Sequence, residues 1–148
     1  MAEPRHWLAG RLAVVTGASR GIGAATAQAI AAAGAHVVLA ARDGEALDAV
    51  ARRIRDDGGE ATAVPTDVSQ VAEVDRLFAT ASEAGPVGAL VCAAAVLTRA
   101  LFADTSSDTW DRTLAISPAS WSSVRELKAP AAATVVGAAA SCRRFTRE

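Results

Sequence analysis

The sequence predicts an α/β protein with an open, doubly wound parallel sheet of about four to five strands. Two observations carry this prediction. Short apolar segments alternate with amphipathic or alanine-rich segments of helical length along residues 11–117. Turns that contain glycine separate the two kinds of segment. Because parallel strands are joined by right-handed helical crossovers, this alternation places helices on both faces of one sheet.

The strands are predicted from short runs rich in valine, leucine and alanine. The first run is apolar throughout and ends at Thr16, which is typical of a strand that is buried on both faces. A later run, Thr134-Val135-Val136, has β-branched residues and could add a fifth strand. The expected strands are residues 12–16, 36–41, 61–65, 87–94 and 134–136.

The helices are predicted from apolar periodicity and from the residues at their ends. Gly34 is expected to follow the first helix, Gly58 the second and Gly85 the third. Ser69 is a suitable N-cap for the third helix. The expected helices are residues 22–33, 45–57, 70–83 and 109–116.

Composition limits the classes of function. The 148 residues carry a formal net charge of −1 and are 51% hydrophobic, which fits one domain with a buried core. This charge balance predicts neither a nucleic acid nor a membrane surface as partner. Cys92 and Cys142 form no pair motif, and the polar start is not a signal peptide, so a cytoplasmic protein is expected. The two histidines, His6 and His36, are isolated, so no metal site is expected.

A glycine-rich turn, Thr16-Gly17-Ala18-Ser19-Arg20-Gly21-Ile22-Gly23, joins the first predicted strand to the first predicted helix. Glycine permits positive φ at such a turn, lets the backbone approach a pyrophosphate and lets the helix pack close to the strand. The free N–H groups and the positive dipole end of the helix would face the phosphates. The alternative is a helix start that happens to be rich in glycine, which leaves three glycines within seven residues unexplained.

Two arginines indicate which dinucleotide this turn would bind. An acidic residue at the end of the second strand would accept hydrogen bonds from an adenosine ribose and repel a 2′-phosphate. Here Ala41 and Arg42 occupy that place, and Arg20 lies within the glycine-rich turn. Because two guanidinium groups can bind a phosphate bidentately, the pattern favours NADP(H) over NAD(H). The alternative is that both arginines are ordinary surface charges.

The turn also resembles the TGxxxGxG signature of the short-chain dehydrogenase/reductase family, whose fixed positions are Thr16, Gly17, Gly21 and Gly23 here. The resemblance covers residues 11–117 and implies a Rossmann-like fold, incomplete in this chain. It further implies hydride transfer between NADP(H) and a carbonyl or alcohol substrate of unknown identity. We expect residues 1–10 to form an N-terminal arm before the first strand, residues 11–117 an NADP(H)-binding Rossmann-like domain, and residues 118–148 a divergent segment with the possible fifth strand.

The resemblance implies a set of residues that contact the cofactor. Asp67 and Val68 match the pair that contacts the adenine edge, although Asp67 could equally be a residue at the entry to a helix. In the run Cys92-Ala93-Ala94-Ala95, only Ala94 matches the Asn-Asn-Ala-Gly pattern of the family. The expected cofactor-binding residues are Gly17, Ser19, Arg20, Gly21, Ile22, Gly23, Arg42, Asp67, Val68 and Ala94.

The residues that the family uses for proton transfer are missing. Its chemistry needs a YxxxK pair, but this sequence has no tyrosine, and its one lysine, Lys128, precedes the possible fifth strand. Ser117 falls where the family has an active-site Asn. Ser141 could correspond to its serine, and the alternative is that Ala140 falls at that position. Impaired catalysis is therefore expected, in a truncated or frame-shifted copy or in a shortened protein. The alternative is a non-catalytic nucleotide-binding or interaction module, which could self-associate through a sheet edge.

Overall fold

The computed structural model describes residues 6–96, 104–116 and 134–137. The elements run in the order β1 (Leu12–Thr16), α1 (Gly21–Ala32), β2 (His36–Ala41), α2 (Gly44–Asp56), β3 (Glu60–Pro65), α3 (Val71–Ala84), β4 (Val87–Cys92), α4 (Ser107–Ile116) and β5 (Thr134–Gly137). The predicted strands and helices are all present, and each boundary lies within two residues of its predicted position.

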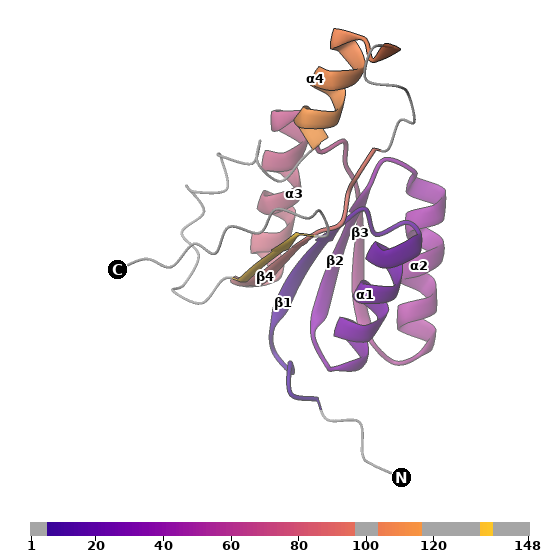
Figure 1. The fold of residues 1–148 in the computed structure, drawn as a ribbon. Coiled ribbons are helices and arrows are strands. Elements are labelled where there is room, and N and C mark those ends of the chain that lie inside the picture. Colours follow the sequence, from indigo (N-terminus) through magenta and orange to yellow (C-terminus); the bar gives the residue numbers. More distant parts are fainter. Residues whose placement is uncertain (1–5, 97–103, 117–133, 138–148) are drawn as a thin grey trace.

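The strands form one parallel sheet in the order β3-β2-β1-β4-β5. Figure 1 shows α1 and α2 side by side on one face of this sheet and α3 on the other face. The predicted doubly wound α/β architecture is therefore confirmed, and the predicted fifth strand pairs with β4. Because β1 lies between β2 and β4, the chain builds outward from β1 in both directions.

Alternate strand residues face the two helical layers, as the period of two in a strand requires. Val14 and Val15 have no solvent exposure but belong to different clusters. The cluster on the α3 side contains Leu12, Val14, Val38, Ala40, Val64, Val74, Leu77, Phe78, Ala81, Leu90 and Cys92. The cluster on the side of α1 and α2 contains Val15, Ala18, Ala27, Ala31, Val37, Leu39, Ala41, Leu47, Ala51 and Ile54. Burying one valine or leucine side chain contributes about 1.5–3 kcal/mol. The two layers therefore fix the position of β1, and the glycine-rich turn begins at the carboxyl end of that strand.

Small residues allow α1 to lie close to the sheet. Gly23, Ala24, Ala27 and Ala31 are its buried residues. The helix ends as predicted, because Ala33 is the C-cap and Gly34 follows it with φ of 95°.

The prediction that Ser69 caps α3 is wrong. The N-cap is Gln70, whose side chain makes no capping hydrogen bond. Ser69 instead donates its N–H and its hydroxyl to Oδ1 of Asp67, over 3.0 and 2.7 Å. The reason is that a carboxylate is a stronger acceptor than a hydroxyl, so Asp67 rather than Ser69 organises this turn.

Cys92 provides a test of the packing between β4 and α3. The side chain is buried in the α3-side cluster, and desolvation raises the pKa of its thiol to about 11. In a Cys142→Ser variant we expect iodoacetamide at pH 8 to label Cys92 at least about tenfold more slowly in buffer than in urea, because only the thiolate reacts. Mass spectrometry measures the labelling. Equal labelling rates in buffer and in urea would contradict the buried position of Cys92.

Candidate functional site

The glycine-rich turn lies at the carboxyl end of β1, where the strand order of the sheet reverses. β1 ends at Thr16, with Ala40 of β2 and Cys92 of β4 as its neighbours in register. In doubly wound sheets, ligands bind beyond the carboxyl ends of the strands at such a switch point. The turn is therefore at the position in the fold where a ligand is expected.

Each of the three glycines in the turn meets a different requirement. Gly17 has φ of 66°, and a Cβ added there would lie 2.6 Å from the backbone C and O of Ala93 and from N of Ala94. A Cβ at Gly23 would collide with the carbonyl of Gly17, so α1 begins tightly against the turn. Gly21 has φ of 58° but has no atom within 4 Å of an added Cβ. The backbone at Gly21 is thus open to an approaching group.

The start of α1 presents N–H groups that no protein group satisfies within the described residues. Arg20 is the N-cap, with an extended backbone and no side-chain capping bond. Ala18 N donates to Ala40 O over 3.2 Å, which fixes the turn to β2. The N–H groups that donate to no described residue belong to Ser19, Arg20, Gly21, Ile22 and Gly23. Converging N–H groups at a helix N-terminus form an anion site.

Thr16 links this turn to the chain that leaves β4. Its side chain is fully buried, and Oγ1 donates to Val91 O and accepts from Ala94 N, both over 3.4 Å. Ala93 N donates to Thr16 O over 3.3 Å. Ala94, a predicted site residue, is thereby held beside Gly17.

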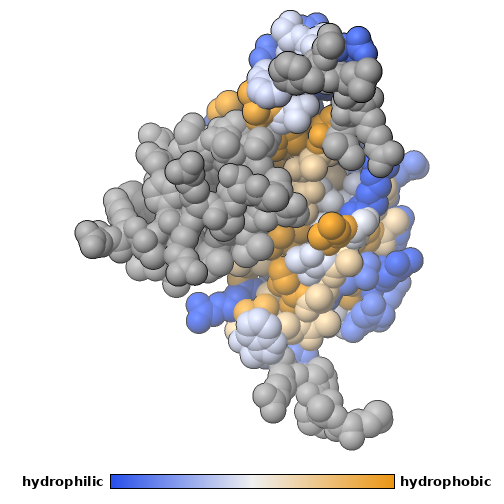
Figure 2. All heavy atoms as spheres, in the orientation of Figure 1, coloured by the Kyte–Doolittle hydropathy of each residue, from blue (hydrophilic) through white to orange (hydrophobic). Residues whose placement is uncertain are grey.

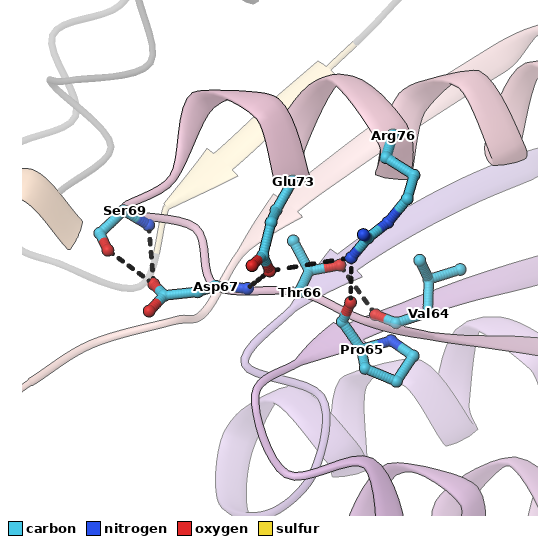
Figure 3. A network of polar contacts seen from close by, with 7 residues as sticks. All are labelled: Val64, Pro65, Thr66, Asp67, Ser69, Glu73 and Arg76. Atoms are coloured by element: carbon cyan, nitrogen blue, oxygen red, sulfur yellow. Dashed lines mark hydrogen bonds and ion pairs between the residues drawn. The ribbon is translucent and has the colours of Figure 1, made fainter.

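The loop between β3 and α3 is fixed by hydrogen bonds among its own groups and to β2 and α3, some of which Figure 3 shows. Thr66 N donates to Ala41 O over 2.9 Å, and Gln70 N donates to Asp67 O over 3.0 Å. Asp67 N donates to Oε2 of Glu73 over 2.6 Å. Among the N–H groups of residues 66–70, that of Val68 alone has no hydrogen-bond partner in the described part of the chain.

Asp67 is an ionised acceptor. The two hydrogen bonds from Ser69 to Oδ1 lower its pKa below the ordinary value, and the nearby charges of Arg42 and Arg112 lower it further. Oδ2 accepts no hydrogen bond from the described residues, so it is available to accept one. Arg112 lies on α4 and was missed in the sequence analysis, because nothing in the sequence indicates that α4 comes near this loop.

The predicted cationic residues are exposed near the turn. Arg20 and Gly21 line a surface hollow of about 470 Å³ between α1 and α2, whose other wall includes Arg53. Figure 2 shows hydrophilic residues gathered over α2, whereas the surface around α1 beside it is mostly apolar. Arg42 is also exposed and follows β2 directly. Ile22 is 72% exposed, which leaves an apolar side chain on the surface at the start of α1.

Other expectations lie partly outside the region that can be described. Ser117 and Ser141, the candidate catalytic residues, fall outside it. Within the described ranges, no group of His, Cys, Asp or Glu side chains could hold a metal ion. None of the helices seen there is long and apolar enough to cross a membrane.

Comparison with known proteins identifies similar chains. The family model described as short chain dehydrogenase matches residues 11–134. The glycine betaine reductase of Emericella nidulans is 43% identical over 112 residues, which cover 75% of this chain and 9% of that protein. The 2,3-dihydro-2,3-dihydroxybenzoate dehydrogenase of Bacillus subtilis is 35% identical over 108 residues, or 72% of this chain and 41% of that protein.

A similar solved structure is the 3-oxoacyl (acyl-carrier-protein) reductase of Agrobacterium tumefaciens with NADP bound. It is 37% identical, with a TM-score of 0.70, over 76% of this chain and 44% of that one. The chain thus spans less than half the length of the relatives it matches here.

Proposed function

The chain belongs to the short-chain dehydrogenase family, and we propose that its described residues form an NADP(H)-binding unit of an oxidoreductase. The observation that carries this proposal is the start of α1, where no described side chain caps the helix and the N–H groups beside Gly21 have no described partner. The cofactor-bound structure of the Agrobacterium reductase supports it, because that protein shares the fold over this region.

The pyrophosphate would be held by the backbone of the glycine-rich turn. Its negative charge suits the positive end of the α1 dipole and the free N–H groups there. Gly17 and Gly23 hold the turn against β4 and α1, and Ile22 would lie against the apolar part of the dinucleotide. The residues assigned to this role are Gly17, Ser19, Arg20, Gly21, Ile22 and Gly23, with Ala94 beside them.

Adenine would be recognised by the loop between β3 and α3. The N–H of Val68, which has no partner among the described residues, is a donor, and Oδ2 of the adjacent Asp67 is an acceptor. Adenine presents the complementary pair, because its N1 accepts and its exocyclic amine donates. The loop thus offers a donor and an acceptor of the kind that this base requires.

The 2′-phosphate of NADP(H) would be held by Arg20 and Arg42. Both guanidinium groups are exposed, and no carboxylate occupies the end of β2, where one would bind an unphosphorylated ribose. This arrangement favours NADP(H) over NAD(H).

Bound NADP(H) would supply the chemistry of hydride transfer to or from a carbonyl or alcohol carbon. Reduction of a carbonyl also needs a proton donor within hydrogen-bond reach, and these 148 residues contain no tyrosine. We therefore expect this stretch of chain to bind the cofactor without appreciable turnover. The absence of tyrosine from these residues also favours a second candidate, a non-catalytic nucleotide-binding or interaction module. Size-exclusion chromatography would test whether such a module self-associates.

The binding proposal is tested by calorimetric titration of the protein with NADPH. One saturable site is expected, and absence of binding would refute the proposal. An assay of NADPH oxidation against a panel of carbonyl compounds is expected to show no rate above the protein-free control. Turnover that disappears in Ser117→Ala or Ser141→Ala would instead assign catalysis to these serines.

A further inference from the structure

Two side chains of α3, Glu73 and Arg76, hydrogen-bond to the backbone of Asp67 and Pro65, where the chain passes from β3 to α3. We propose that they are positioning residues for recognition of the adenine base, an inference that rests on the proposed function. Neither side chain would touch the cofactor. They would act by holding the backbone of Asp67 and Val68 with its free groups directed outward.

Glu73 makes the central contact. It is the third residue of α3, where a glutamate commonly reaches back to the N–H of the N-cap residue. Here the carboxylate passes over the N-cap and accepts from Asp67 N over 2.6 Å (Figure 3). The contact therefore restrains the loop itself, and hydrogen bonds to a charged acceptor are about twice as strong as neutral ones.

Arg76 connects Glu73 to the end of β3. Its guanidinium donates to Pro65 O over 3.1 Å and lies 3.8 Å from Oε2 of Glu73. The Arg76 side chain is 61% exposed and that of Glu73 is 37% exposed, so solvent weakens the ion pair. We accordingly expect Glu73 to contribute more than Arg76.

These contacts determine which polar groups of the loop remain available. Thr66 is buried and donates Oγ1 to Val64 O and its N–H to Ala41 O, which fixes the start of the loop to β3 and β2. Ser69 closes the turn on Oδ1 of Asp67. Glu73 occupies the N–H of Asp67, so the N–H of Val68 and Oδ2 of Asp67 are left as an adjacent donor and acceptor.

Without Glu73, the N–H of Asp67 would lose its partner. The bonds of Thr66 and Arg76 would still fix the end of β3, but past Thr66 the loop would be oriented by the turn of Asp67 alone. The donor and acceptor would then no longer be held at a fixed spacing. The consequence concerns the choice of base rather than the phosphates, because Arg20, Arg42 and the glycine-rich turn are on other segments of the chain.

Hypoxanthine is a sharp probe of this arrangement. It carries a donor at N1 and an acceptor at the 6-position, which reverses the pattern of adenine. It would face the N–H of Val68 with a donor and the carboxylate of Asp67 with an acceptor. The reduced hypoxanthine analogue of NADPH should therefore bind the unsubstituted protein at least about tenfold more weakly than NADPH, because polar groups of the site would be left unpaired.

The experiment measures Kd for NADPH, its hypoxanthine analogue and NADH by calorimetry, in the unsubstituted protein and in Glu73→Ala. We expect Glu73→Ala to weaken NADPH about tenfold, the equivalent of one hydrogen bond to a charged group. Its preference for adenine over hypoxanthine should be largely lost, whereas its preference for NADPH over NADH should be unchanged. A purely structural role would lower the thermal midpoint without changing the base preference.

Matched variants complete the test. Glu83→Ala changes an exposed glutamate in the last turn of the same helix and should alter none of the three affinities. Glu73→Gln keeps an acceptor oxygen and should restore most of the base preference. Arg76→Gln should reduce NADPH affinity only about two- to threefold, as expected for an exposed pair. If Glu73→Ala does not fold by circular dichroism, Glu73→Asp, whose shorter side chain withdraws the carboxylate from Asp67 N, should show the same loss of base preference.

The outcomes separate this inference from the proposed function. Absence of NADPH binding by the unsubstituted protein would refute the proposed function. NADPH binding without any preference for adenine, or an undiminished preference in folded Glu73→Ala, would overturn the role of Glu73 while leaving the cofactor assignment intact.

Discussion

Replacing Gly17 with alanine is expected to destabilise the fold by about 2–5 kcal/mol and to abolish NADPH binding, because two penalties act at once. The backbone at Gly17 has φ of 66°, which costs a residue with a Cβ about 1–2 kcal/mol. The new Cβ would also lie 2.6 Å from backbone atoms of Ala93 and Ala94, which cannot rotate away as a side chain could. Either the turn or the end of β4 must move, and the free N–H groups would no longer converge.

Gly58→Ala is the matched control for this change. Gly58 has φ of 84°, but an added Cβ would meet no atom within 4 Å, so the substitution imposes the backbone strain alone. We expect a loss of about 1–2 kcal/mol and unchanged NADPH affinity. Urea unfolding at constant m-value measures both variants, and the difference between them isolates the contact with Ala93 and Ala94. Equal losses in the two variants would show that this contact does not constrain the turn.

The elements were predictable because their signals are local. Gly34 follows α1 and Gly58 follows α2 with positive φ, as the sequence indicated. The end of β4 was placed two residues too late, since the apolar run continues through Ala93 and Ala94. The sequence cannot reveal that strand pairing stops after Cys92, where the backbone turns to lie against Gly17.

The contacts that shape the candidate site were harder to predict, because they join segments distant in sequence. The bonds of Thr16 to Val91 and Ala94 span more than seventy residues. The sequence alone did not show that Ser69 would donate to Asp67 Oδ1 instead of capping α3. Nothing in the sequence distinguishes Glu73, since glutamate is common in the first turn of a helix.

Arg42→Ala is expected to raise the Kd for NADPH about thirtyfold, which corresponds to the loss of charge-assisted hydrogen bonds to a phosphate. NADH lacks the 2′-phosphate, so its Kd should change less than about twofold, apart from the small effect that Arg42 exerts through Asp67. Calorimetric titration of both cofactors at two salt concentrations measures this, and the NADPH effect should shrink as salt increases.

Arg42 is a better test of cofactor choice than Arg20. The backbone N–H of Arg20 belongs to the proposed pyrophosphate site, so changing that residue can disturb binding of both cofactors. Arg42 follows β2 and lies outside the turn, so its side chain can be removed without altering the start of α1. Arg52→Ala, which removes an exposed arginine from α2, should leave both affinities unchanged. If Arg42→Ala weakened NADPH and NADH equally, Arg42 would not be bound to the phosphate that distinguishes them, and the preference for NADP(H) would lose its physical basis.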